Sequence, residues 1–500
     1  MKRVFSSPFV AFAVGICLRL FFVLKFPSSS GDTVLYEQIA TNWLKHGAYA
    51  MNVGGALTPV DIRMPGYPAF LAILYALTGR TGESARLAVM LAQVAIDLLT
   101  CFVIAALAAL LISGISPDGN TKRVRTAALW LAAACPFTAN YTAVPLTEVL
   151  AMFFTSCALY YLILQLRRIE NPLFRLNGAH VDSRRSVEYT GIGAGFLAGM
   201  GTLVRPETPL LLIAAALVYF WIFLRRKEPL RWLRVVAVLA ASFLLLLVPW
   251  GIRNVITLNE PQFLAPRDSN LPGELVPRGF MNWEKTWLFR ISDCYRVTWK
   301  LNDEVINLED IPARAFETPE ERQRVADILE QYNDDLTLTP EEDASFAQLA
   351  RERTRRHPLR TYLWLPAARA LTLWFSPRIE RLPFSGHVFP LAQAWEDDPV
   401  DQAVTITLFL LNILYVALAL WGALRLWQRH PSARLAVALF GVFIAVRTAF
   451  LTTVEAPEPR YTLVCFPALI ALAAQLFARP SGSAGQGFSP DIKPLHVQGP

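Results

Sequence analysis

Long blocks of apolar residues constrain this chain more than any other feature. A helix needs about 20 residues to cross a hydrocarbon core about 30 Å thick, where backbone groups find no water to bond. We expect such spans at 8–26, 84–112, 124–140, 145–165, 189–204, 207–224, 234–250, 402–424, 434–451 and 461–478. The chain is 54% hydrophobic and 17% charged, against about a quarter charged residues in soluble domains. The sequence therefore predicts an all-α polytopic membrane protein with about ten spans.

The basic residues between these blocks predict which side faces the cytoplasm. Short cytoplasmic loops are enriched in lysine and arginine. The clusters that fall on one side are Lys2/Arg3, Lys122/Arg123/Arg125, Arg167/Arg168/Arg184/Arg185, Arg225/Arg226/Lys227/Arg231/Arg234 and Arg425/Arg429/Arg434. The opposite short connections, 141–144 and 205–206, hold only Arg205. This pattern accounts for the net charge of +7, and we expect no nucleic-acid partner.

The topology divides the chain into four parts. We expect an N-terminal transmembrane module at 1–250, whose first outer loop is 27–83, and a long extracytoplasmic segment at 251–401. C-terminal transmembrane helices follow at 402–478, and 479–500 is predicted to be a disordered cytoplasmic tail rich in Gly, Ser and Pro.

Two apolar stretches of the outer segments are interpreted as helices in the membrane interface. Segment 361–375 carries Arg369 and Pro366 and, if it crossed, would place the last arginine cluster outside. Segment 68–79 is too short to cross.

The polar stretch that precedes the interfacial segment 361–375 contains two helix starts. Thr318 and Thr339 are each followed by Pro-Glu-Glu, which places an N-cap threonine before a proline at the first helical position. These starts predict a small α-helical cap outside the membrane.

Asp32 is the first candidate for chemistry, because it follows the first span directly. A carboxylate at the membrane surface can act as a general base for an acceptor hydroxyl or amine. Alternatively, Asp32 caps the helix that begins near Thr33.

Arginines near the outer ends of spans form a second candidate group. They are Arg63, Arg205, Arg253 and Arg460. Guanidinium is the best planar partner for a phosphate, so some of them could bind a phosphorylated ligand. The alternative is that they extend to lipid headgroups, as basic side chains at span ends commonly do.

Ionisable residues inside the predicted spans are a third group. Such groups are costly in lipid and usually serve a function. We expect Asp97 and Arg447 to form a structural ion pair, and Glu148, near the outer end of its span, to face an outer cavity. Walker A, GxGxxG, HExxH and GxSxG motifs are absent from the sequence, so a phosphate-driven pump or a hydrolase of the soluble type finds no support.

An ordered set of short motifs resembles GT-C glycosyltransferases, in particular the protein-mannosyltransferase-like and aminoarabinose-transferase-like group with its rhizobial lipopolysaccharide members. The motifs are Gly31-Asp32 with Tyr36, Ala40 and Gly47-Ala-Tyr49; Arg63-Met-Pro-Gly-Tyr67-Pro68; Pro136; Leu146-Thr-Glu148; Gly201-Thr-Leu-Val-Arg205-Pro206; Pro249-Trp-Gly-Ile-Arg253-Asn254; and Pro459-Arg460-Tyr461 with Pro467. The resemblance covers about 30–480.

The resemblance implies an inverting transferase with a polyprenyl-phosphate-sugar donor and a lipid, glycan or protein acceptor. Asp32 would be the base. The donor and acceptor would be bound by Tyr36, Arg63, Tyr67, Glu148, Arg205, Arg253, Arg460 and Tyr461. It also implies a bacterial inner membrane location with the active site on the periplasmic side.

Two departures from the family pattern bear on cofactors and substrate. The usual phosphate-binding lysine has no clear counterpart except Lys45, and Thr33 follows Asp32 where eukaryotic protein mannosyltransferases have a second acid. We therefore expect no cofactor, although a divalent metal stays an open alternative. The alternative hypotheses for the function are a secondary transporter and a non-catalytic subunit of an envelope-assembly complex.

Overall fold

The computed structural model describes residues 7–115, 118–171, 183–266, 268, 271, 274–389 and 391–479, without the side chains of 118, 183, 184, 393 and 394. The basic pair Lys2/Arg3, the side chain of Arg184 and the predicted disordered tail beyond Arg479 lie outside the described residues.

Helices occupy the predicted membrane spans. They are α2 (Pro8–Lys25), α5 (Arg86–Leu110), α6 (Asp118–Ala133), α8 (Glu148–Glu170), α9 (Ser183–Val204), α10 (Pro209–Arg225), α11 (Pro229–Leu258), α18 (Pro399–Arg429), α19 (Arg434–Leu451), and the last span in three pieces, η8 (Pro459–Cys465), α20 (Phe466–Ala473) and η9 (Ala474–Phe477). Within the described part of the chain, 7 of these segments are long and apolar enough to cross a membrane. The predicted fold class of a polytopic helical membrane protein is confirmed, and the number of spans stays a prediction.

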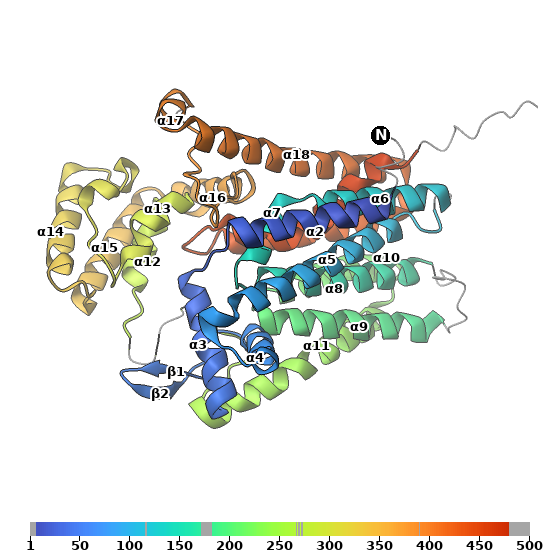
Figure 1. Ribbon diagram of the computed structural model, residues 1–500, viewed down its shortest axis with the longest axis horizontal. Coiled ribbons are helices and arrows are strands. Elements are labelled where there is room, and N and C mark those ends of the chain that lie inside the picture. Colours follow the sequence, from blue (N-terminus) through green and yellow to red (C-terminus); the bar gives the residue numbers. More distant parts are fainter. Residues whose placement is uncertain are drawn as a thin grey trace, which may run out of the picture.

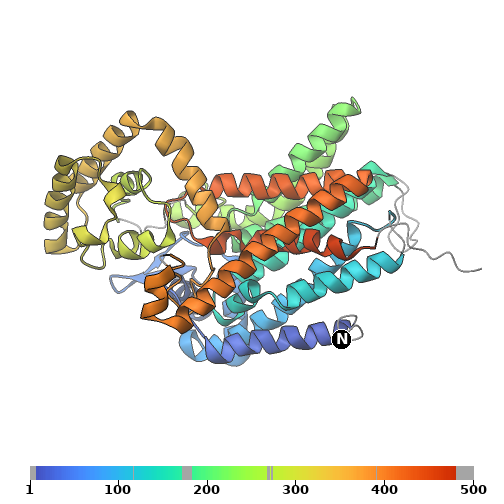
Figure 2. The same cartoon turned by 90° about the horizontal axis from the view of Figure 1, so that it is seen from above.

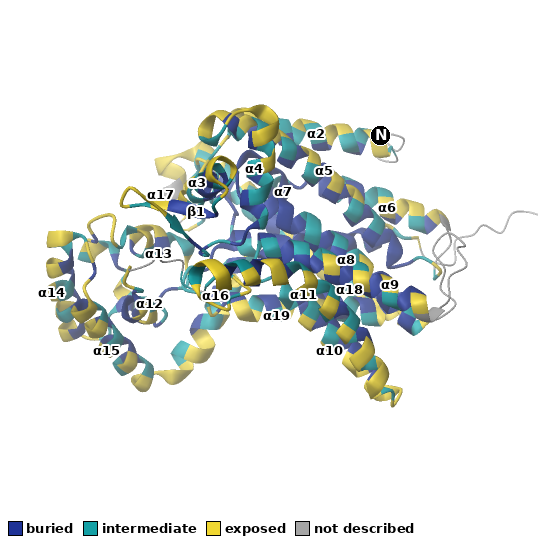
Figure 3. Cartoon of the chain, turned by 90° about the horizontal axis from the view of Figure 1, so that it is seen from below, coloured by how far each residue is buried: buried dark blue, intermediate teal, exposed yellow. Residues whose placement is uncertain are grey.

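The long helices lie side by side as one bundle, and the outer elements gather beyond one end of it (Figure 1). These are α3 (Gly31–His46), α4 (Gly66–Thr78), η1 (Gly82–Ala85) and, farther out, α12 (Arg278–Glu284), α13 (Ile291–Arg296), α14 (Pro319–Asp335) and α15 (Pro340–Arg356). The view from above shows the same separation (Figure 2). Burial follows it, because buried residues concentrate inside the bundle and exposed ones on the outward helix faces (Figure 3).

Prolines lie at changes of helix type in two of the predicted spans. The predicted span 124–140 ends as a helix at Ala133, and Pro136 starts a separate short helix, α7 (Pro136–Ala139), followed by η2 (Asn140–Ala143). In the last span the 3-10 helix η8 passes directly into α20 at Phe466, which places Pro467 in the first turn of α20. Proline lacks the N–H that a continuous helix requires and clashes with the preceding turn. By contrast, α11 continues past Pro249 to Leu258, eight residues beyond the predicted boundary at 250.

A β-hairpin in the first outer loop was not predicted. Strands β1 (Ala50–Val53) and β2 (Ala56–Pro59) pair antiparallel, with Val53 opposite Ala56. The two connecting residues, Gly54 and Gly55, have φ of 57° and 85°. A two-residue turn with both φ values positive suits the twist of a hairpin and favours glycine. The Gly-Gly pair was therefore the available sequence signal.

The outer cap has its own hydrophobic core. Trp283, Trp287 and Phe346 are almost fully buried in it. Both predicted helix starts are confirmed, because the Thr318 side chain accepts a hydrogen bond from the Glu321 N–H and that of Thr339 accepts one from Glu342. Short turns η3 (Thr298–Lys300), η4 (Leu308–Asp310) and η5 (Ala313–Ala315) complete the cap.

The predicted interfacial segments are helical. Segment 361–375 forms the π-helical turn η6 (Arg360–Trp364) and α16 (Leu365–Trp374), which exposes Trp364 and buries Arg369. Arg369 donates to the carbonyls of Leu288, Lys285 and Thr452, so it joins α16 to the cap and to the end of α19. Helix α17 (Leu391–Asp397) and η7 (Pro431–Ala433) flank α18. The depth of α4 and α16 in a membrane stays a prediction.

The predicted ion pair between Asp97 and Arg447 is wrong. Asp97 accepts from Arg19 of α2, with Nε and Oδ2 2.8 Å apart, and both side chains are almost fully buried. Arg447 lies 3.3 Å from Glu207 and donates to the Tyr461 carbonyl. Both acids satisfy the rule that buried charges are paired, but the partners were set by helix rotation and depth.

Candidate active site

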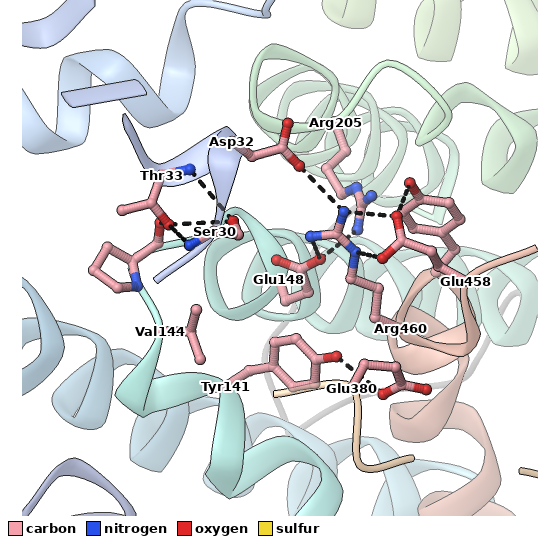
Figure 4. A network of polar contacts seen from close by, with 12 residues as sticks. Ser30, Asp32, Thr33, Tyr141, Val144, Glu148, Arg205, Glu380, Glu458 and Arg460 are labelled. Carbon is pink, nitrogen blue, oxygen red and sulfur yellow. Dashed lines mark hydrogen bonds and ion pairs between the residues drawn. The ribbon is translucent and has the colours of Figure 1, made fainter. Parts of the chain in front are cut away.

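The side chain of Asp32 is free of the capping role. Helix α3 begins at Gly31, and its N-cap is Ser30, whose hydroxyl accepts from the Thr33 N–H at 3.4 Å while Thr33 Oγ1 accepts from the Ser30 N–H at 3.1 Å. Thr33 also donates to the Pro145 carbonyl, which ties the start of α3 to the loop before α8. The reading of Asp32 as the helix cap is therefore wrong, and its carboxylate points toward other elements (Figure 4).

Two arginines from distant parts of the chain bind the Asp32 carboxylate. Arg63 Nη2 lies 2.6 Å from Oδ1, and Arg460 Nη2 lies 3.1 Å from Oδ2. Burial by itself raises the pKa of Asp32, but the two guanidinium charges and their hydrogen bonds outweigh it and lower the pKa to about 2. Asp32 is thus ionised at any physiological pH while 28% of its side chain stays exposed.

Aromatic residues of the first outer loop support Arg63. Its guanidinium lies 5.9 Å from the centre of the Tyr36 ring, and that ring meets Tyr67 edge to face. The Tyr67 hydroxyl is buried and donates to Gln93, whose amide donates to the Val144 carbonyl. Gln93 was missed from the sequence, although a buried amide in a span is the kind of polar group that needs an explanation.

Glu148 stands at the first residue of α8, where the helix dipole favours a carboxylate. Its Oε1 atom lies 3.3 Å from Arg205 and 3.5 Å from Arg460. Its Oε2 atom is buried, and no described residue gives it a hydrogen bond. Glu148 therefore keeps one acceptor atom available inside the cluster.

Two acids that the sequence analysis missed complete the cluster. Glu458 contacts Arg460 at 2.7 Å and accepts from the Tyr461 hydroxyl at 2.6 Å, and Glu207 contacts Arg205 at 3.2 Å. The signal was local: each acid is separated by one residue, a proline, from a candidate arginine at the outer end of a span.

The positive and negative charges in this cluster are equal in number, but its members differ in solvent exposure. Four arginines, Arg63, Arg205, Arg447 and Arg460, face four acids, Asp32, Glu148, Glu207 and Glu458. The exposed side-chain fractions are 28% for Asp32 and 17% for Arg63, whereas Arg205 and Glu207 are at 12% and the other members lower. The pair of Asp32 and Arg63 is thus the part of the cluster that a ligand can reach most easily.

Arg253 lies outside this cluster. It donates to the carbonyls of Tyr49 and Val60, at 2.6 and 2.8 Å, and its guanidinium lies over the rings of both Tyr49 and Trp250, which contact each other. These contacts attach the hairpin to α11. Its predicted contact with a substrate stays a prediction.

Two cavities lie near the candidate residues, one beside Pro459 and the other beside Arg253. One of about 660 Å³ lies between the cap, segment 372–389 and α18, and its lining includes Glu380 and Pro459. Glu380 accepts from the Tyr141 hydroxyl at 3.4 Å. The other, of about 510 Å³, lies beside Arg253 between the hairpin and α11 and is lined largely by apolar side chains, including Trp43 and Leu246.

The candidate metal ligands are dispersed. Throughout the described ranges, no three His, Cys, Asp or Glu side chains are grouped so that they could hold a metal ion. The expectation of no cofactor stays a prediction.

No protein-family model and no curated protein matches this chain. Among solved structures, it resembles the oligosaccharyltransferase AglB from Archaeoglobus fulgidus in complex with an inhibitory peptide and a dolichol-phosphate, at 12% identity and a TM-score of 0.46. That alignment covers 93% of this chain, which spans about half of the archaeal protein, since 50% of that chain is covered. ArnT from Cupriavidus metallidurans bound to undecaprenyl phosphate matches at 15% identity and a TM-score of 0.40, over 90% of this chain and 77% of that one. Both neighbours are GT-C fold glycosyltransferases, the group that the sequence motifs resemble, but TM-scores below 0.5 assign neither an activity nor a substrate.

Proposed function

We propose that this chain is an inverting glycosyltransferase that moves a sugar from a polyprenyl-phosphate donor to an envelope lipid, glycan or protein acceptor. The reaction takes place at the outer face of a membrane, in our proposal the periplasmic face of a bacterial inner membrane. The observation that carries the proposal is the accessible pair of Asp32 and Arg63, which places an ionised carboxylate beside a guanidinium at the outer end of the bundle.

The pair can perform both halves of such a transfer. The acceptor oxygen or nitrogen attacks the anomeric carbon, its proton passes to Asp32, and the bond to the donor phosphate breaks with its electron pair going to the leaving phosphate. Arg63 lies where it can neutralise the charge that develops on that phosphate. One displacement at the anomeric carbon inverts its configuration.

Donor binding activates the base in this scheme. Asp32 is a weak base while Arg63 and Arg460 hold its pKa near 2. A donor phosphate competes for Arg63, because guanidinium binds phosphate and carboxylate with the same bidentate geometry. Withdrawal of Arg63 raises the pKa of Asp32, so the carboxylate gains basicity when the donor is in place.

The remaining predicted ligands occupy supporting positions in the proposal. Arg460 contacts both Asp32 and Glu148, and Arg205 stacks on Tyr461 at 4.9 Å.

The test compares acids of the same loop at equal expression. We expect Asp32→Asn and Asp32→Ala to reduce transfer by about 10²- to 10⁴-fold, the usual contribution of a general base. Asp61→Asn is the matched control, because Asp61 lies in the same loop and does not contact Arg63 or Arg460 among the described ion pairs. The measurement is the mass of membrane glycolipids and surface glycans in a deletion strain complemented with each variant. Modification at the parental level in both Asp32 variants would refute the base assignment.

A further inference from the structure

The helix ends farthest from Asp32 enclose a third cavity, of about 1080 Å³. Helix α8 connects the two regions: Glu148 at its start belongs to the Asp32 cluster, and Arg167, nineteen residues on, lines the cavity. At 1.5 Å per residue the two residues are about 28 Å apart along the axis. The cavity also takes residues from the turn after α5, from the ends of α10 and α18 and from the start of α19. The distribution of basic residues predicts that this end is cytoplasmic.

The charge of this cavity is strongly positive. Four arginines line it, Arg167, Arg225, Arg226 and Arg434, and Glu170 is the acid among its lining residues. In the part of the chain that the structure describes, no carboxylate lies within 4 Å of any of these guanidiniums. An uncompensated group of this kind attracts an anion.

The arginines retain hydrogen-bond donors for a ligand. Arg226 and Arg434 each donate to one carbonyl, of Ile169 and Trp427, at 2.9 Å. A guanidinium has five N–H donors. Arg225 is exposed and makes no hydrogen bond to a described residue, so most donors around the cavity are available.

Arg167 gives an independent sign of a missing partner. It is 95% buried, since 5% of its surface is exposed, and it donates to the Ser432 and Leu111 carbonyls. Its Nε–H is buried and has no acceptor among the described residues, and Oε2 of Glu170 is likewise buried without a donor. Buried polar groups are seldom left unpaired, because each costs free energy comparable to a lost hydrogen bond.

Two exposed tryptophans indicate that the cavity lies at the edge of the lipid. Trp221 and Trp427 line it, are 50% and 45% exposed, and stack under Arg225 and Arg434 at 4.4 and 5.8 Å. Next to them Leu224, Leu424 and Trp421 are exposed on the outer faces of α10 and α18. Tryptophan is enriched at headgroup depth, where its ring is half apolar and half hydrated.

We propose that this cavity binds the phosphate headgroup of an anionic phospholipid from the adjacent membrane leaflet, with Arg225, Arg226 and Arg434 as its ligands. Basic pockets between helix ends on this side of a membrane suit such headgroups. The apolar faces beside Trp221 and Trp427 accommodate the acyl chains. The site is separate from the Asp32 cluster, and the proposal does not depend on the proposed transferase reaction.

The test is retention of dioleoylphosphatidylglycerol against dioleoylphosphatidylcholine. The full chain is reconstituted in nanodiscs that contain both lipids. It is then extracted into mild detergent, and the lipids that remain bound are identified by native mass spectrometry. We expect the wild type to retain one phosphatidylglycerol and the variant Arg225→Gln/Arg226→Gln to bind it on the order of 25-fold more weakly, about fivefold for each charge removed. Arg123→Gln/Arg231→Gln is the matched control, since both residues are exposed on the same side and do not line the cavity; it should retain lipid as the wild type does.

Two further measurements make each outcome decisive. Arg225→Gln alone removes no hydrogen bond to the described residues, so it reports on lipid retention even if the double variant unfolds. Glycerol 3-phosphate and inorganic phosphate at 10 mM should leave the bound lipid in place. Equal loss in the control variant would show only a diffuse positive surface, and displacement by either soluble phosphate would show a soluble ligand; both results overturn the proposal.

Discussion

The two ends of α8 use the same side chain in opposite ways. At the outer end, arginines Arg63, Arg205 and Arg460 each contact at least one carboxylate, and the cluster carries no net charge. At the other end, Arg167, Arg226 and Arg434 donate to backbone carbonyls and keep their charge. A guanidinium bound to a carboxylate lowers the pKa of that acid, whereas a guanidinium bound to a helix carbonyl keeps its positive charge available to attract an anion. This difference separates a candidate reactive site from a candidate binding site.

The largest effect is expected for Arg460. Replacing it with glutamine leaves Glu148 and Glu458 buried beside an uncharged side chain. Breaking a buried ion pair by removing one partner typically costs 3–5 kcal/mol, and we expect the free energy of unfolding to fall by about 5 kcal/mol. Denaturant titration in micelles, followed by tryptophan fluorescence, measures this change. The control is Arg231→Gln, because Arg231 forms an exposed ion pair with Glu228, and we expect it to change the free energy of unfolding by less than about 0.5 kcal/mol. Equal effects in both variants would contradict the contrast.

Glu284 in the cap is a buried acid that makes no ion pair with an arginine among the described residues. It is fully buried and accepts from Thr298, and burial, with smaller contributions from Glu455 and Asp293, raises its pKa to about 8. Because the folded pKa exceeds the ordinary value of 4.5, its stabilising contribution is complete below pH 4.5 and is lost as the pH rises toward 8. We expect cap stability to fall by a few kcal/mol between pH 5 and 9.

The control for this pH dependence is Glu284→Gln, which cannot ionise. Hydrogen exchange of cap amides, followed against pH, should show a flatter profile in the variant than in the wild type. An unchanged slope would mean that Glu284 does not hold a proton in the folded cap.

Arg63 should set the basicity of Asp32. In Arg63→Gln, Arg460 remains as the cationic partner, so we expect the pKa of Asp32 to rise from about 2 toward its ordinary value of 3.8. In the wild type the paired carboxylate contributes stability above pH 3.8 that is lost as the pH falls through 2, and the variant should lose that contribution at higher pH. Carboxyl ¹³C shifts of labelled aspartate measure the pKa directly. A pKa that stays near 2 would mean that Arg460 alone accounts for it.

The smallest effect is expected at the cavity end. Arg225→Gln removes an exposed side chain that stacks on Trp221 and contacts no carboxylate of the described residues. We expect the free energy of unfolding to change by less than about 0.5 kcal/mol, in contrast to Arg460→Gln. The same micelle titration measures it. A loss as large as that of Arg460→Gln would show that the arginines of this end are structural.

The features that the sequence determined are local ones. The hydropathy blocks predicted where helices stand, and the Thr-Pro-Glu-Glu starts at Thr318 and Thr339 predicted two helix N-termini. Asp32, Arg63, Glu148, Arg205 and Arg460 were named from the sequence and lie in one cluster. Span lengths and helix caps depend on residues a few positions apart, so the sequence carries them directly.

Partnerships between helices were decided only by the tertiary structure. Asp97 pairs with Arg19 and not with Arg447, Ser30 and not Asp32 caps α3, and Arg253 binds the hairpin. Glu207 and Glu458 join the cluster although neither was a candidate. Apolar burial is non-directional, so it fixes that a helix is in the bundle but not its rotation or depth. Those two variables determine which charged side chains meet, and they are set by the packing of the whole chain.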